Sequence, residues 1–244
     1  MRLPKKIDHR LVDTIIRVQF LASVPPESVI GYVHSCWREQ SVGLVTERIP
    51  KLRFGPTDLT LEPSPSFFFL TADNRFRVDV DNISITFNSV GDYTGWSDFE
   101  TVFQRCIQPL FDQSIIGQVQ RLGVRYINRF DQIRIFDHID MSVRVGRVVP
   151  ANSRQQVRAE FDRNGFLSVL TLVNDYPSEP VQIGHLGEHF FSLIDVDVIK
   201  LFNQTNPPGY IELISALEAA HTEEKTIFFG LLTESFLKTL NPVY

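Results

Sequence analysis

Several features that would assign this chain to a particular class of protein are scarce or missing. Only two cysteines, Cys36 and Cys106, occur in 244 residues, and they form no CxxC motif. The apolar runs, such as residues 67–70, are far shorter than the roughly 20 residues of a membrane helix. No basic-then-apolar signal sequence opens the chain. We therefore expect a cytoplasmic protein with free thiols, no disulfide framework and no membrane association.

Nucleic-acid binding and the commonest cofactor folds are also disfavoured. The formal net charge is -5, from 24 basic and 29 acidic residues, which argues against a dedicated DNA- or RNA-binding protein. The sequence contains no P-loop, no GxGxxG fingerprint and no GxSxG motif. We therefore expect no cofactor. With 20 phenylalanines but only 2 methionines and 2 tryptophans, the core is expected to be rich in phenyl rings.

The middle of the chain contains a strand with two different faces. In an extended segment alternate side chains point to opposite faces. The face predicted to be cationic carries Arg121, Gly123, Arg125, Ile127 and Arg129. The face predicted to be core carries Leu122, Val124, Tyr126 and Phe130. Neighbouring arginines lie about 13 Å apart at about 3.3 Å per residue, so each would take a separate anionic partner.

The rest of the sequence predicts an α+β fold, with one or more antiparallel sheets and long helices packed on one side. Helices are predicted at residues 27–40, 97–113 and 210–240, the last with a bend near His221 or Gly230 or with an extension against a partner. Strands are predicted at residues 11–20, 66–71, 75–80, 83–89, 120–130 (continuing weakly through 132–136), 141–149, 155–162, 165–174 and 190–199. Residues 45–65, with four prolines, are predicted to be mostly loop with one short strand near 58–62, and residues 175–188 to be mostly loop.

A weak internal repeat indicates two similar halves. Asp79-Val80-Asp81 precedes Gly95-Trp96 at the start of one helix, and Asp195-Val196-Asp197 precedes Gly209-Tyr210 at the start of another. The pattern suggests a duplicated unit of strands followed by a helix, with chance similarity as the alternative. The predicted halves are residues 1–117 and 118–244, which could also form one continuous domain.

The arginines of the central strand leave two interpretations open. In the first, they pair with aspartates on neighbouring strands, as in an ordinary cross-strand ladder. In the second, Arg121, Arg125 and Arg129, with Asn128 near one end, receive an anionic ligand or an acidic partner segment. Guanidinium groups match both carboxylate and phosphate geometry, so the sequence does not decide between these interpretations.

Two aspartate pairs and one tryptophan are further candidates for a binding site. The aspartate pairs Asp79 with Asp81, and Asp195 with Asp197, could hold Mg²⁺, but no glycine-serine loop for phosphates precedes the first pair, so no metal is expected. Trp96, beside Gly95, could stack on a ligand or could anchor the start of a helix to the core. No complete catalytic set of residues is present.

The chain resembles a sporadically distributed family of uncharacterised bacterial and archaeal proteins of about this length. The similar segments are residues 11–20, the turn Tyr93-Thr94-Gly95-Trp96-Ser97-Asp98-Phe99, the segment Arg121-Leu122-Gly123-Val124-Arg125-Tyr126-Ile127-Asn128-Arg129, residues 194–197 and Leu232-Thr233-Glu234. The resemblance implies a free-standing protein with no catalytic residues to carry over. Its patchy distribution suggests mobile or defence-related gene neighbourhoods.

Two functions from different classes follow. The first is a non-enzymatic cytoplasmic binding or regulatory module that recognises a partner protein, or forms a homodimer, within a defence or toxin-neutralising system. The sheet face or the long last helix is expected to make the contact. The alternative is a nucleotide- or phosphate-binding protein, with metal-dependent phosphoryl or nucleotidyl transfer as its activity.

Overall fold

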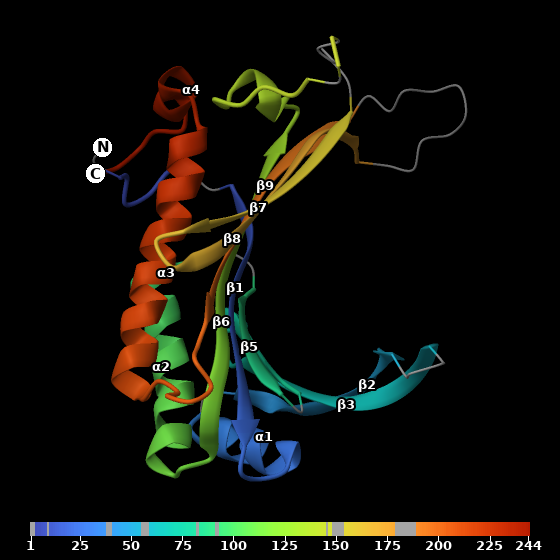
Figure 1. Ribbon diagram of the computed structural model, residues 1–244, viewed down its shortest axis with the longest axis vertical. Coiled ribbons are helices and arrows are strands. Elements are labelled where there is room, and N and C mark those ends of the chain that lie inside the picture. Colours follow the sequence, from blue (N-terminus) through green and yellow to red (C-terminus); the bar gives the residue numbers. More distant parts are fainter. Residues whose placement is uncertain are drawn as a thin grey trace. The chain divides into compact units, whose positions relative to one another are not determined.

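The computed structural model describes residues 3–8, 10–37, 41–54, 59–81, 83–90, 93–144, 146–147, 154–178 and 189–244 (Figure 1). For residues 42, 47–54 and 59–66 it describes the backbone alone. The strands are β1 (Leu11–Ala22), β2 (Ser41–Phe54), β3 (Leu59–Thr71), β4 (Phe76–Val80), β5 (Ser84–Ser89), β6 (Ile116–Asp131), β7 (Gln155–Arg163), β8 (Phe166–Pro177) and β9 (Phe190–Leu201). The helices are α1 (Pro26–Ser35), α2 (Trp96–Asp112), η1 (Ile135–Asp137, a 3-10 turn), α3 (Tyr210–Leu231) and α4 (Glu234–Thr239).

The nine strands form one antiparallel sheet in the order β2-β3-β4-β5-β1-β6-β9-β8-β7. The α+β class and the antiparallel pairing predicted from the sequence are therefore confirmed. Tight turns join β4 to β3 and β8 to β7, and each uses an asparagine with a positive φ, Asn74 at 55° and Asn164 at 51°. Asparagine tolerates this left-handed conformation better than most residues, so it suits a hairpin turn.

The chain divides into two compact units. Unit 1 comprises Met1–Thr14, Val124–Lys200 and Glu218–Tyr244, and unit 2 comprises Ile15–Gly123 and Leu201–Leu217. Because the division falls inside β1, β6 and α3, neither unit is one continuous segment of sequence. The division into halves at 117/118 stays a prediction.

Unit 2 is held together by α2 lying on β4 and β5. Every third or fourth residue of α2 is buried, as expected for a helix with one apolar face. Phe99 stacks on Phe76 of β4 with ring centroids 5.9 Å apart, and Phe103 meets Phe87 of β5 edge-on at 5.1 Å. Alternate residues of both strands point into this aromatic layer, which confirms the predicted phenyl-rich core.

In unit 1 the buried face of β6 packs against α3 and α4. Tyr126 lies beside His221 of α3 with ring centroids 5.6 Å apart, and Phe130 lies beside Phe236 of α4 at 5.8 Å. The strands β8 and β9 show the same alternation of buried and partly exposed residues. One face of each strand therefore supplies the core.

The segment 45–65, predicted to be mostly loop with one short strand near 58–62, is instead strand at every described residue, so only the short strand was predicted correctly. Its described residues belong to β2 and β3, which pair with each other from Ser41 with Thr71 to Phe54 with Leu59. The prolines of this segment predict a loop, because each one considered alone interrupts a strand. They are tolerated because Pro50 lies directly opposite Pro63, at a position where neither backbone nitrogen bonds to the other strand.

Two shorter strand predictions also fail. Gln132 adopts a positive φ of 58°, which ends β6, and η1 follows instead of a continued strand. Of the strand predicted at 141–149, the described residues 141–144 and 146–147 are irregular, and the others lie outside the described ranges. The preceding segment bonds to the end of α3, with Asp140 N donating to Leu231 O at 2.7 Å.

The last predicted helix is divided into two. α3 ends at Leu231, one residue beyond Gly230, and Thr233 caps α4 by accepting a hydrogen bond from the Phe236 backbone N–H at 3.3 Å. The expected bend near Gly230 is thus a complete break. Within the described ranges no helix combines the length and apolar character needed to cross a bilayer.

Candidate functional site

The predicted two-faced character of β6 is present in the structure. Leu122, Val124, Tyr126 and Phe130 are buried, with at most 4% of their surface exposed, whereas the arginines at 121, 125 and 129 are partly exposed. Gly123, expected on the cationic face, is buried. Arg121 belongs to unit 2, and Arg125 and Arg129 belong to unit 1.

Arg125 of β6 forms a bidentate ion pair with Asp195 of the neighbouring strand β9. Its Nε donates to Asp195 Oδ1 at 2.8 Å and its Nη2 donates to Oδ2 at 2.7 Å. These hydrogen bonds raise the pKa of the guanidinium, and Asp197 and Asp13 add to the effect through their charge. Burial raises the pKa of Asp13, which lies near the same pair. The cross-strand interpretation therefore holds for Arg125.

Neither Arg129 nor Asn128 is placed as the predicted ligand site requires. Arg129 Nε donates to Asp131 Oδ1 at 2.8 Å, and its guanidinium lies 4.4 Å above the centre of the Phe191 ring. Asn128 is 2% exposed and points to the core face of the strand. An even-numbered residue of this strand cannot share a face with the odd-numbered arginines, so Asn128 does not join them.

The first aspartate pair, Asp79 and Asp81, accepts hydrogen bonds from residues of unit 2. Asp79 accepts three hydrogen bonds from Arg77, the shortest 2.6 Å, and one from Asn88 at 3.1 Å. Asp81 accepts the backbone N–H groups of Ile83 and Ser84 and lies 3.7 Å from Arg17 Nη2. In the part of the chain that the structure describes, no group of three or more His, Cys, Asp or Glu side chains is arranged to hold a metal ion.

Trp96 begins α2 and contacts the core. Its ring meets Phe99 edge-on at 6.4 Å, and Tyr93 meets the same ring at 6.5 Å. These contacts correspond to the helix-anchoring alternative.

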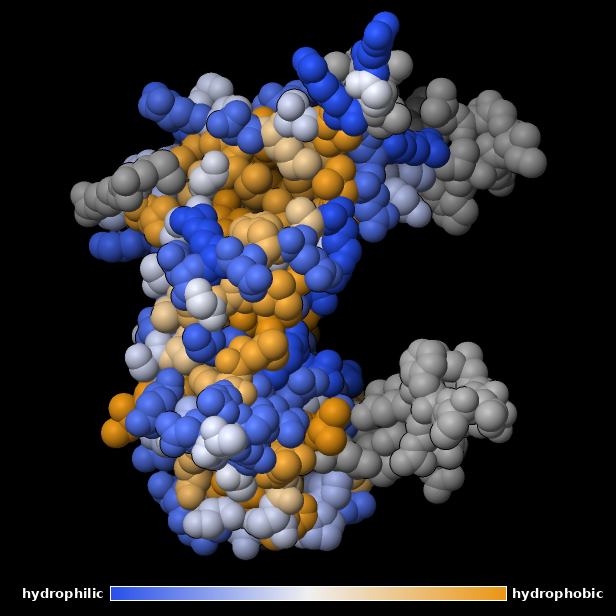
Figure 2. Space-filling view, viewed as in Figure 1, coloured by the Kyte–Doolittle hydropathy of each residue, from blue (hydrophilic) through white to orange (hydrophobic). Residues whose placement is uncertain are grey.

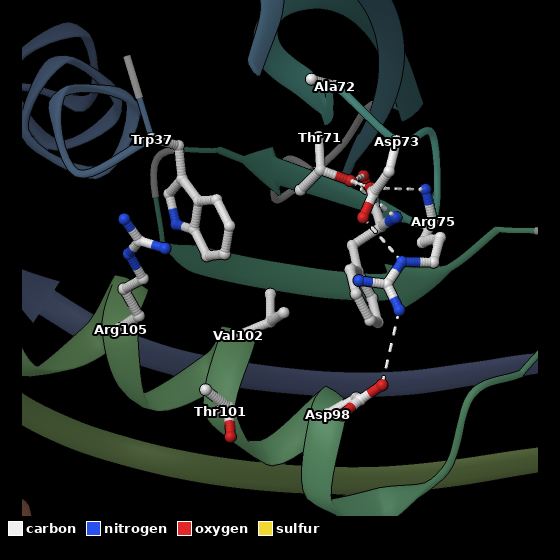
Figure 3. A pocket seen from close by; sticks show the side chains of 10 residues that line it. Trp37, Thr71, Ala72, Asp73, Arg75, Asp98, Thr101, Val102 and Arg105 are labelled. Carbon is white, nitrogen blue, oxygen red and sulfur yellow. Dashed lines mark hydrogen bonds and ion pairs between the residues drawn. The ribbon is translucent and has the colours of Figure 1, made fainter. Parts of the chain in front are cut away.

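A cavity of about 370 Å³ lies in unit 2, at a place that the sequence did not indicate (Figure 3). Three segments line it: the turn after α1, the β3–β4 turn and the outer face of α2. The lining residues are Trp37, Thr71, Ala72, Asp73, Arg75, Phe76, Asp98, Thr101, Val102 and Arg105. Its volume is at the lower end of the range of about 300–1,000 Å³ for ligand pockets.

One end of this cavity is a charge cluster around Arg75. Arg75 Nε donates to Asp73 Oδ2 at 2.6 Å, and Nη1 donates to Asp98 Oδ2 at 3.4 Å. Burial alone would raise the pKa of Asp73, but hydrogen bonds from Thr71 and Arg75 outweigh it and lower the pKa to about 2. Asp73 is therefore ionised at any physiological pH and keeps Arg75 in place.

The other end of the cavity is an arginine stacked on an indole. The Arg105 guanidinium lies 4.3 Å from the centre of the Trp37 ring, and Trp37 Nε1 donates to Cys106 Sγ at 2.8 Å. Trp37 is 7% exposed and Cys106 is fully buried, so the hydrogen bond to Cys106 holds the indole on its buried side. Burial raises the pKa of the Cys106 thiol above its usual range.

A sequence signal for this cavity exists in α2. Asp98, Thr101, Val102 and Arg105 have the spacing i, i+3, i+4, i+7 of one helix face, beside the apolar face formed by Phe99, Phe103 and Cys106. The spacing alone gives no reason to expect a hollow, because the turn at Asp73 and the indole of Trp37 come from distant parts of the sequence.

The described surface also carries exposed hydrophobic side chains. Figure 2 shows hydrophobic areas interrupted by hydrophilic residues on the face it draws, and the exposed large hydrophobic side chains come from elements all along the chain. Single exposed hydrophobic residues of this kind are normal.

Comparison with known protein families, with curated proteins and with solved structures finds no match to this chain.

Proposed function

We propose that this protein is a non-enzymatic cytoplasmic binding module that recognises a partner protein, and that the β2–β3 ribbon makes the contact. The ribbon consists of residues 47–54 of β2 paired with residues 59–66 of β3. The observation that carries the proposal is the pairing of β3: it pairs with β4 only over Phe67–Leu70, whereas its pairing with β2 continues to Leu59. Figure 1 shows β2 and β3 continuing past the other strands of unit 2.

A two-stranded ribbon is at best marginally stable in water when nothing else packs on it. Among the described residues, no third strand pairs with residues 59–66 of β3. A ribbon of eight consecutive residue pairs gains stability when a partner covers one of its faces. Recognition of another protein is therefore the function that suits this element best.

The prolines of the ribbon indicate which surface a partner would contact. Pro50 lies opposite Pro63, and Pro65 lies opposite Arg48 at the next equivalent position. At such positions the backbone nitrogen points outward, and in proline it carries no hydrogen. Each edge of the ribbon therefore lacks an outward N–H donor at its prolines, which disfavours pairing with a further strand there. A partner would contact the faces of the ribbon rather than extend the sheet.

We propose a defence or toxin-neutralising system as the setting of this module, because the sporadically distributed prokaryotic family that the chain resembles has a patchy distribution. A phosphate-binding function is less well supported, because Arg125 and Arg129 have carboxylate partners within the chain. Phosphoryl transfer has no further support, since Asp79 is bound by Arg77 and Asp195 by Arg125.

We further propose that the chain arose by internal duplication, with the helices of both halves on one side of the sheet. Strand order supports this proposal: β3-β4-β5-β1 in one half corresponds to β7-β8-β9-β6 in the other. In both halves the last strand of an antiparallel meander lies next to the half's first strand, and a helix follows the meander.

The test is co-purification with the products of neighbouring genes. In one variant, residues 47–66 are replaced by Asn-Gly, which joins Thr46 to Phe67, a directly opposed pair at the base of the ribbon. We expect a stable complex on size-exclusion chromatography for the full chain and none for the ribbon-deleted chain. Light scattering of the chain alone identifies a second copy as the partner.

The control variant is Ile211→Ser, which changes an exposed side chain of α3 outside the ribbon. It should bind the partner as the unchanged chain does, and circular dichroism should show that the deleted variant is folded. If no neighbour product and no second copy binds, or if the ribbon-deleted chain binds equally well, the proposal is wrong.

A further inference from the structure

We propose that the cavity between Trp37, the β3–β4 turn and α2 binds an aromatic carboxylate. The ligand carboxylate would lie on Arg75, and its ring would lie against the guanidinium of Arg105, which is stacked on Trp37. This site is separate from the β2–β3 ribbon and does not depend on the function proposed for it.

Arg75 has the donors to hold a carboxylate. Of the five N–H groups of its guanidinium, one bonds to Asp73 and one to Asp98. The remaining three include both hydrogens of Nη2, which points towards the Trp37 side of the cavity in Figure 3. A planar carboxylate is a good geometric match for such a fork.

The two aspartates orient Arg75 and leave room for an added anion. Asp73 accepts hydrogen bonds from Thr71 Oγ1, Arg75 N and Arg75 Nε, so its oxygens are already occupied. Asp98 makes a longer contact of 3.4 Å, and its side chain is 53% exposed. An incoming carboxylate can therefore compete with Asp98 for Arg75 while Asp73 keeps the arginine in position.

The opposite end of the cavity is suited to a ring. Trp37 is fixed by its bond to Cys106, and Arg105 covers its face at 4.3 Å. Guanidinium groups attract aromatic rings, and both Trp37 and Arg105 line the cavity, so the ring of a ligand would lie against this stacked pair. Between the two ends lie the buried side chains of Val102 and Phe76, which supply an apolar floor.

The spacing of the two ends sets the size of the ligand. Asp98, which contacts Arg75, and Arg105 are seven residues apart on α2, which is about 10 Å along the helix axis. One ring joined to one carboxylate by a short linker spans this distance with a contact at each end. Both a free aromatic acid and the C-terminal phenylalanine of a peptide have this chemistry.

The fluorescence of Trp37 provides the assay. The chain has two tryptophans, so Trp96→Phe leaves Trp37 as the single indole. Phenylacetate is titrated into the full-length protein, with phenylacetamide as the uncharged match and cyclohexylacetate as the match without a ring. We expect a saturable change with phenylacetate, at least tenfold weaker binding of cyclohexylacetate, and no change with phenylacetamide.

Variants separate the two ends of the site. Arg75→Gln should weaken phenylacetate binding at least tenfold, and Asp98→Asn should tighten it, because a competing carboxylate is removed. Arg105→Ala should abolish the preference for phenylacetate over cyclohexylacetate. Arg158→Gln, at an exposed arginine of β7, should change nothing. Asp98→Asn alters only an exposed residue, so it gives a result even if Arg75→Gln does not fold.

A second arm distinguishes the source of the ligand. The peptide Gly-Ser-Gly-Phe with a free C-terminus is compared with the same peptide amidated, and with phenylacetate. Tighter binding of the free-acid peptide identifies a protein C-terminus, and tighter binding of phenylacetate identifies a small metabolite. The proposal is wrong if phenylacetate gives no saturable change, or if phenylacetamide gives the same response. It is also wrong if Arg75→Gln leaves the binding of phenylacetate unchanged, or if Asp98→Asn does not tighten it.

Discussion

At the scale of single residues, the arginines of β6 show what a sequence pattern does and does not determine. The alternation of apolar and cationic residues predicted which side chains of β6 are buried, and the structure agrees except at Gly123 and at Asn128, which was expected beside the arginines. The partners were not predictable. Asp195 is 70 residues from Arg125 in sequence, and only the pairing of β9 beside β6 brings them together.

The Arg125–Asp195 pair should stabilise the fold more than an exposed pair does. Its aspartate side chain is 13% exposed, whereas both partners of the Arg158–Glu160 pair are more than half exposed. A double-mutant cycle with Arg125→Gln and Asp195→Asn should give a coupling energy of about 1 kcal/mol from urea unfolding. The same cycle with Arg158→Gln and Glu160→Gln is the matched control and should give about 0.5 kcal/mol or less.

If the exposed pair couples as strongly as Arg125 and Asp195, the partial burial of Asp195 has no energetic consequence. Such a result would also weaken the conclusion that Arg125 is held within the protein.

At the scale of elements, α3 carries two titratable groups in unfavourable surroundings. Glu224 lies in the buried stripe with Leu217, Ala220 and Phe228 and is 3% exposed. Burial raises its pKa to about 8, and the charge of Lys225 opposes this shift. Burial also lowers the pKa of His221 to about 3, where its Nδ1 lies 3.3 Å from the Tyr126 hydroxyl. Both side chains are therefore neutral at pH 7.

These shifts predict how stability depends on pH. Glu224 keeps its proton in the folded state up to about pH 8 but ionises near 4.5 when unfolded, so its contribution to stability falls as the pH rises between these values. His221 takes up a proton near 6.5 when unfolded but only near 3 when folded, so its contribution is lost as the pH falls between these values. The free energy of unfolding should therefore be greatest between about pH 4.5 and 6.5.

Urea unfolding from pH 4 to 9 measures this dependence, with a limiting slope of about 1.4 kcal/mol per pH unit for one proton. Glu224→Gln should remove most of the fall above pH 6.5, and His221→Phe most of the fall below 4.5. As the control, Glu160→Gln, at an exposed residue of β7, should leave the profile unchanged. A profile insensitive to Glu224→Gln would show that this carboxyl is not held neutral.

The strands β2 and β3 show why some elements escaped prediction. Prolines at 50, 63 and 65 are reliable signs of loops when each is considered alone. They are compatible with a ribbon because their positions are matched across two strands, and that match depends on a register that the sequence does not display. The helix α2, whose apolar residues recur every three or four positions, required no such information and was predicted with nearly its observed ends.

At the scale of the whole molecule, the division into units follows neither the order of the sequence nor the ends of the strands and helices. β1, β6 and α3 each contribute residues to both units. Sequence analysis predicted the fold class and most strands, but not the order of strands in the sheet. The cavity was also missed, since its lining comes from residues 37, 71–76 and 98–105.

Shared elements predict a single unfolding transition. A strand or helix that belongs to both units cannot lose its structure in one without disturbing the other, so we expect equal calorimetric and van't Hoff enthalpies in differential scanning calorimetry. The fragment of residues 1–117 should show no cooperative transition, because it ends two residues into β6. Two resolved transitions, or a folded 1–117 fragment, would contradict this expectation.

The hydrogen bond between Trp37 and Cys106 has a consequence for chemical labelling. Cys36 is partly accessible, whereas Cys106 is enclosed behind the indole and its thiol resists ionisation. An alkylating reagent such as iodoacetamide should therefore modify Cys36 first and reach Cys106 only when α2 separates from the turn that carries Trp37. The delay between the first and second mass increments would report how often that part of the native protein opens.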